Sequence, residues 1–138
     1  MTEICLISGG MIFGVLGLLH AFYTLRDTQR PRRLAPDNAE VIARMSSSYV
    51  RLSRGGTTMW RAWLGFNFSH SLGAILFCFM CMFLAFNLQR LALPQTALLF
   101  PVVIGLIYFW LAIRYWFYIP AIGIALGTSC FLVAWLAY

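Results

Sequence analysis

The sequence predicts an all-α integral membrane protein, an antiparallel four-helix bundle with an amphipathic interfacial helix in its first loop. Of its 138 residues, 62% are hydrophobic and only 10% are charged, whereas soluble domains carry about 25% charged residues. A bilayer core takes about 20 apolar residues per helix, and the chain holds four apolar stretches of that order. We predict a single transmembrane domain over residues 1–138 with spans at about 4–25, 59–88, 96–115 and 119–137.

The first stretch is predicted to remain as a helix rather than to act as a secretory signal. Its apolar part is preceded by the acidic residue Glu3 and by no basic residue. No small-residue cleavage site comes before Tyr23 and Arg26. Residues 26–58 form the only long polar stretch. The other connections are short, which forces successive helices to lie antiparallel.

The basic residues predict how the chain is oriented. All ten are arginine, and seven lie in the loop of residues 26–58: Arg26, Arg30, Arg32, Arg33, Arg44, Arg51 and Arg54. Arg61 and Arg114 fall on the same side of the predicted bundle, and only Arg90 falls on the other. Because positive residues are retained in the cytoplasm, we expect the loop inside and both termini on the non-cytoplasmic side.

The charge also indicates the partners. A net charge of +6 in a soluble protein would suggest nucleic acid, but arginines between apolar spans fit anionic lipid better, and no nucleic-acid partner is expected. The arginines predicted to contact anionic lipid are Arg30, Arg32, Arg33, Arg44 and Arg51.

Within the loop, the sequence predicts an extended segment and then a helix. Residues 30–33 and Pro36 stay extended, because proline lacks an N–H donor and restrains its neighbour. Asp37 is predicted to cap the helix, with Glu40 reaching back as in a capping box.

The pattern of this loop helix suits a membrane surface. An apolar stripe is formed by Val41, Met45 and Leu52. Arg44 and Arg51 share another stripe, residues 55–56 are glycines that would end the helix, and Thr58 would cap the second span. A solvated linker helix is the alternative.

Small residues at helical spacing predict close helix packing. Helices in lipid associate through such residues and through hydrogen bonds rather than through hydrophobic burial. The predicted packing residues are Gly10, Gly14 and Gly17 in the first span, Gly65, Ser69 and Gly73 in the second, and Gly123 and Gly127 in the fourth. The spacing leaves open whether these stripes pack within the bundle or between subunits.

One face of the second span carries polar groups. At about 100° per residue, residues 63, 67, 70, 71, 78 and 81 share roughly a third of the helix circumference. On the first span, His20 shares a face with Thr24 and Asp27. Polar groups inside a membrane need partners, so His20, Asn67 and His70 should point inward. The candidate ligand-binding residues are His20, Asn67, His70, Ser71 and Trp63.

Three uses of this face remain open. The polar groups can hydrogen-bond between helices, they can orient the head of a lipid or quinone-like ligand, or the histidines can bind haem or another metal. An axial offset of about 7 Å between His20 and His70 disfavours one shared metal. Cys78 and Cys81 have C-x-x-C spacing, but their apolar neighbours favour core packing.

These observations favour a non-enzymatic accessory or oligomeric membrane subunit, with a lipid or other apolar ligand at the polar face. The alternative is an enzyme or carrier for an apolar small molecule in which His20 or His70 transfers a proton; haem or metal binding comes third. We assign no catalytic residue, metal ligand or required cofactor. The expected partners are membrane lipids and further copies or other membrane subunits.

Two segments carry a resemblance to known proteins. Residues 57–73, TTMWRAWLGFNFSHSLG, and residues 18–27, LLHAFYTLRD, resemble a group of small uncharacterised bacterial four-span membrane proteins. The resemblance covers about the first two helices and the loop between them. It implies the four-span fold and a bacterial cytoplasmic membrane, and it brings no activity.

Overall fold

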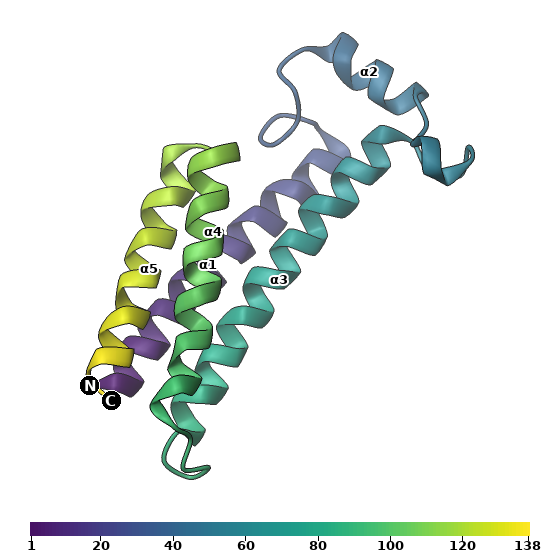
Figure 1. Ribbon diagram of the computed structural model, residues 1–138. Coiled ribbons are helices and arrows are strands. Elements are labelled where there is room, and N and C mark those ends of the chain that lie inside the picture. Colours follow the sequence, from purple (N-terminus) through teal and green to yellow (C-terminus); the bar gives the residue numbers. More distant parts are fainter. The chain divides into compact units, whose positions relative to one another are not determined.

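A computed structural model describes residues 1–138 and confirms the predicted all-α fold class, with four long apolar helices packed against each other (Figure 1). Each is long and apolar enough to cross a membrane, and the protein is an integral membrane protein. The elements are α1 (Thr2–Gln29), α2 (Ala39–Ser47), the 3-10 turn η1 (Arg51–Ser53), α3 (Met59–Asn87), the 3-10 turn η2 (Gln95–Leu98), α4 (Leu99–Tyr115) and α5 (Tyr118–Leu136).

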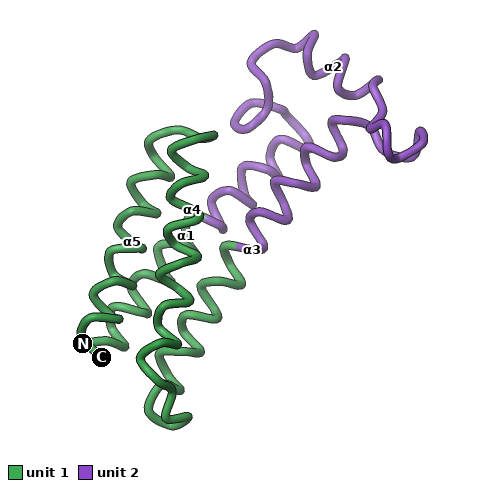
Figure 2. The backbone as a smooth tube through the Cα atoms, viewed as in Figure 1, with its two compact units in different colours: residues 1–16, 74–138 green, residues 17–73 purple.

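The chain divides into two compact units (Figure 2). Unit 1 comprises residues 1–16 and 74–138, and unit 2 comprises residues 17–73. Both α1 and α3 contribute residues to each unit. Unit 1 therefore contains segments of all four long helices, and unit 2 contains the loop with the parts of α1 and α3 that flank it.

Four aromatic side chains, one from each long helix, form the centre of unit 1. The Phe13 ring of α1 lies edge-on to Phe77 of α3 at 5.0 Å and to Tyr108 of α4 at 5.6 Å between centroids. Phe131 of α5 lies 5.8 Å from Phe13 and 5.5 Å from Phe77. Edge-to-face pairs of this kind stabilise by about 0.5–1.5 kcal/mol beyond their buried area. This aromatic cluster ties the four helices together.

Glycines bring α1 and α5 into close contact beside this cluster. A Cβ atom on Gly9 would lie 2.5 Å from the Phe131 ring and 2.9 Å from the carbonyl oxygen of Gly127. A Cβ on Gly127 would lie 2.9 Å from the Phe13 ring. Gly9 was not among the predicted packing residues, and its neighbours show that α1 packs by a wider glycine face than the predicted stripe.

The predicted packing residues differ in what surrounds them. Cβ atoms on Gly10 and Gly14 would lie 2.8 Å from Cys81 Cβ and from Cys78 Sγ, so α1 also packs closely on α3. Gly123 faces the Leu16 side chain at 3.0 Å. Of the others, Gly73 is half-buried, Ser69 is exposed, and Gly65 is exposed with no atom within 4 Å of an added Cβ. Gly17 is buried.

Hydrogen bonds join the end of α5 to the connection between α3 and α4. Gln95 Nε2 donates to the carbonyl of Trp135 at 2.8 Å, and the Tyr138 hydroxyl donates to the carbonyl of Leu93 at 2.7 Å. Both chain termini lie at this end of unit 1 (Figure 1). This is the arrangement that an even number of antiparallel helices produces.

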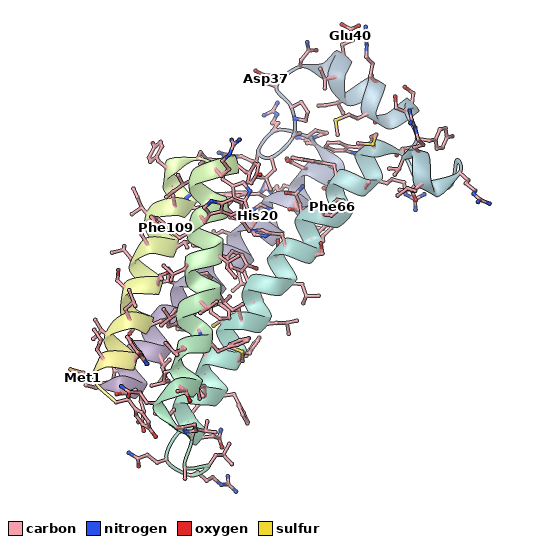
Figure 3. The ribbon with its side chains drawn as sticks, viewed as in Figure 1. Met1, His20, Asp37, Glu40, Phe66 and Phe109 are labelled. Atoms are coloured by element: carbon pink, nitrogen blue, oxygen red, sulfur yellow. The ribbon has the colours of Figure 1, made fainter.

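The loop helix α2 begins one residue later than predicted. Asn38, not Asp37, is its N-cap: Asn38 Oδ1 accepts a hydrogen bond from the backbone N–H of Glu40 at 2.8 Å. The Glu40 carboxylate pairs with Arg44 at 2.6 Å instead of reaching back to the cap. Figure 3 labels Asp37 and Glu40 on either side of the cap. Both Asp and Asn cap well, so residue type alone did not distinguish them.

The loop helix is also shorter than predicted. It ends at Ser47, so the predicted stripe does not include Leu52, which is 93% exposed on the separate turn η1 with Arg51. Serine hydroxyls near its end bond to backbone carbonyls, which weakens helix continuation. The chain then turns back through a single bridge between Tyr49 and Thr58. Thr58 does cap α3, accepting from the N–H of Arg61 at 3.3 Å.

We predict that Gly9→Ala destabilises the protein, whereas Gly65→Ala does not. The added methyl group at Gly9 has to displace the Phe131 ring or the α5 backbone, and overpacking of this kind costs about 1–3 kcal/mol. At Gly65 no atom of the same chain lies within 4 Å of an added Cβ, and alanine is still small enough for close helix contact, so the gain in helix propensity of up to about 1 kcal/mol is retained. Thermal unfolding in detergent measures both. Equal melting temperatures for the two variants would contradict the close contact of α1 with α5.

Candidate functional site

The candidate site in unit 2 is a set of polar side chains between α1 and α3, here called the polar seam: His20, Thr24, Asn67, His70 and Ser71. Its central hydrogen bond joins His20 Nε2 to Asn67 Oδ1 at 2.9 Å. The amide nitrogen of Asn67 donates to the carbonyl of Trp63 at 2.7 Å. Because the amide oxygen can only accept, His20 Nε2 is the donor in this bond. Figure 3 labels His20 on α1.

The two histidines of the polar seam are neighbours. Their ring centroids lie 5.0 Å apart with the planes at 70°, and both residues are half-buried. The predicted offset of about 7 Å was the difference in height of the two residues along their helix axes. In the structure the two side chains extend toward each other and meet despite this difference. The sequence therefore predicted which histidines face protein, and the structure shows that they meet.

The hydroxyl groups of the seam bond to their own helices. Thr24 Oγ1 donates to the carbonyl of His20, and Ser71 Oγ donates to the carbonyl of Asn67, both at 2.8 Å. Every buried side-chain nitrogen or oxygen in the chain has a hydrogen-bond partner. Trp63 contributes its carbonyl, and its side chain is exposed. The seam thus fixes α1 against α3 through groups that the chain itself satisfies.

A second polar arrangement, centred on Asp27, was missed by the sequence analysis. The Asp27 side chain is 1% exposed, and its carboxylate accepts four backbone hydrogen bonds of 2.7–3.0 Å. The donors are the N–H groups of Arg32 and Arg33 to Oδ1 and of Leu34 and Ala35 to Oδ2. One signal was available: an acidic residue near a helix C-terminus is unfavourable with the helix dipole and so needs another reason to be there.

The folded-back segment surrounds Asp27 with arginines. A hollow of about 590 Å³ is lined by Arg26, Asp27, Gln29, Arg30, Arg32 and Arg33. Two of the guanidinium groups lie over aromatic rings, Arg26 over Phe22 at 5.3 Å and Arg33 over Tyr23 at 5.6 Å. Of the arginines predicted to contact anionic lipid, three line this arginine hollow.

The other two predicted lipid-contacting arginines lie elsewhere in the loop. Arg44 is on α2 and pairs with Glu40, and Arg51 is exposed on η1. The structure therefore separates the basic loop into a clustered part and a dispersed part.

The other candidates are a metal site and the two cysteines of α3. No set of three or more His, Cys, Asp or Glu side chains lies close enough to hold a metal ion. Cys78 and Cys81 are buried free thiols that pack against the glycines of α1 in unit 1, as the apolar neighbours predicted. No protein family, curated protein or solved structure matches the chain.

We predict that His20 and Asn67 are energetically coupled. In a double-mutant cycle with His20→Ala and Asn67→Ala, the coupling should be about 0.6 kcal/mol and at most about 1.7 kcal/mol, the range for hydrogen bonds between membrane helices. Ser129, whose hydroxyl bonds only within α5, provides the control cycle of His20→Ala with Ser129→Ala, which should be additive within about 0.5 kcal/mol. Unfolding in detergent supplies the free energies. Additivity of the first cycle would rule out the seam as a contact that stabilises the fold.

Proposed function

We propose that this integral membrane protein is a non-enzymatic accessory or oligomeric subunit whose polar seam organises its own helices. The observation that carries the proposal is the hydrogen-bond network of Asn67, which bridges His20 Nε2 on α1 and the carbonyl of Trp63 on α3. Each end of the Asn67 amide makes a hydrogen bond within the chain. This supports a structural use of the seam.

The other side of the same part of α3 supports assembly. Gly65 has no atom within 4 Å of an added Cβ, Ser69 is exposed, and Phe66 is 75% exposed. Small residues four positions apart let two helix backbones approach closely in a membrane. A second copy of this chain is the occupant that we propose for this α3 face, defined by residues 65, 66 and 69.

The proposed location is a bacterial cytoplasmic membrane with the loop of residues 26–58 in the cytoplasm. Nine of the ten arginines lie on the loop side of the four spans and only Arg90 lies on the other, a bias that the positive-inside rule associates with the cytoplasm. The bacterial part of this proposal follows only from the resemblance expected of residues 18–27 and 57–73. The membrane then presents anionic lipid to the basic loop.

A second function is favoured by one observation, the direct contact of the two imidazole rings at 5.0 Å. Histidine transfers protons near neutral pH, so His20 and His70 could serve an enzyme or carrier for an apolar small molecule. The two functions differ in what the purified protein contains. A stoichiometric quinone, haem or other apolar molecule, found by mass spectrometry and absorption spectroscopy of native material, would favour this second function.

We predict that Ser69→Leu weakens self-association, whereas Ser129→Leu does not. Both serines are exposed and bond to their own helix carbonyls, so the two changes are matched in chemistry. Overpacking at a helix contact costs about 1–3 kcal/mol, which should raise the dissociation constant of the oligomer about fivefold or more. Native mass spectrometry from lipid nanodiscs resolves multiples of the 15.7 kDa chain. A wild-type protein found only as a single chain with no other subunit would contradict the proposed role.

We predict that His70→Ala lowers stability without changing the mass of the assembly or its bound molecules. Removing the ring deletes its contact with His20, and polar contacts between membrane helices contribute roughly 1 kcal/mol each. The melting temperature and the content of co-purified molecules are measured together. Loss of a bound apolar molecule at unchanged stability would instead support the enzyme or carrier.

A further inference from the structure

The carboxylate of Asp27 is directed at the backbone and not at the arginines around it. Both of its oxygens accept two backbone N–H groups each, from residues 32–35, and the side chain is buried. Elsewhere in the same loop, Glu40 uses its carboxylate to pair with the guanidinium of Arg44. Asp27 therefore folds the arginine-rich segment back without occupying the guanidinium groups with its own charge.

Two of these guanidinium groups make cation–π contacts. Arg26 lies over Phe22 and Arg33 lies over Tyr23. A guanidinium carries its N–H donors in a planar fork that suits the oxygens of a phosphate. These contacts restrain two of the guanidinium groups in the arginine hollow. Less ordering of these side chains is therefore needed when a ligand binds.

The hollow has the charge of an anion site. Four arginines and one carboxylate line it, which leaves an excess of three positive charges. Arginine forks bind the oxygens of phosphate and of carboxylate in pairs.

The surface of α1 next to the hollow is apolar and indicates the rest of the ligand. Leu18, Phe22 and Leu25 are exposed, and their spacing of four and three residues places them on one side of the helix. Arg26, which lines the hollow, is one turn beyond Phe22. An apolar strip next to a basic hollow is complementary to a phospholipid, in which acyl chains are joined to a phosphate.

We propose that the arginine hollow of Arg26, Arg30, Arg32 and Arg33, organised by Asp27, binds the phosphate headgroup of an anionic phospholipid whose acyl chains lie along α1. The proposal rests on the membrane placement of this loop given above, and it is independent of the proposed self-association. It assigns the lipid contact to the clustered arginines and not to Arg44 or Arg51. Basic pockets at the cytoplasmic ends of membrane helices bind anionic headgroups in this way.

The variant Asp27→Asn distinguishes lipid binding at an organised site from lipid binding by charge attraction alone. The change removes one negative charge and raises the net charge from +6 to +7, so attraction alone predicts tighter binding of anionic lipid. An organised site predicts the opposite, because the four backbone bonds lose their charged acceptor. We expect the apparent dissociation constant for phosphatidylglycerol to rise about fivefold or more, equal to the contribution of about one arginine at a membrane surface.

The matched control is Asp37→Asn, which makes the same charge change at an exposed position. It should leave phosphatidylglycerol binding unchanged or slightly tighter. Native mass spectrometry of the full chain, from phosphatidylcholine nanodiscs with increasing phosphatidylglycerol, measures both. Tighter binding in Asp27→Asn, or equal effects of the two variants, would overturn the proposal.

A pair of triple variants tests the site even if Asp27→Asn does not fold. One replaces Arg30, Arg32 and Arg33 with Gln, and the other replaces Arg44, Arg51 and Arg54 with Gln, so each removes three positive charges. We expect the first to weaken phosphatidylglycerol binding at least about tenfold and the second less than about threefold. Equal losses in the two triple variants would overturn the proposal in favour of a diffuse field.

A competition experiment distinguishes the lipid from a free anion. Millimolar inorganic phosphate should not displace phosphatidylglycerol, because it lacks the acyl chains that contact α1. Full displacement would overturn the lipid assignment. The oligomeric mass, measured in the same spectra, should be unaffected by the arginine variants, so a failure of this proposal is distinguishable from a failure of the proposed subunit role.

Discussion

Helices in a membrane cannot be held together by the hydrophobic effect, because lipid is as apolar as their own side chains. This constraint explains the two kinds of contact that the protein contains. In unit 1, glycines allow α1 and α5 to approach closely, and the rings around Phe13 fill the space between the four helices. In unit 2, the bond between His20 and Asn67 joins α1 to α3. Close packing and hydrogen bonding are the two means of association that lipid leaves available.

The same constraint gives different roles to the two faces of the first half of α3. Its seam side, with Asn67 and Ser71, is satisfied within the chain. Its other side, with Gly65 and Ser69, has the residue types of a packing surface but no close neighbour from the chain at Gly65. At the loop, Asp27 adds a third contact, one that shapes the backbone. The proposed assembly and the proposed lipid site thus use separate surfaces and can be tested separately.

Much of the fold was predictable because apolar length is a local property. The four spans, the Thr58 cap and the burial of Cys78 and Cys81 follow from residue type and spacing near each position. The loop was predicted less well. Asp37 and Asn38 are adjacent and both are good caps, so residue type did not distinguish which of them begins α2. Its end at Ser47 depended on the bridge from Tyr49 to Thr58.

The sequence by itself determined that the chain has four apolar helices, a basic loop, and polar side chains that must face protein, because each follows from composition and helical spacing. Only the tertiary structure decided which partners those groups have. The contact of His20 with Asn67 joins residues 47 positions apart, and Gly9 meets Gly127 across two helices. The four amides on Asp27 depend on the path of the chain after α1 ends. Hydrogen bonds and close contacts act over a few ångströms in space, and distance along the chain does not specify them.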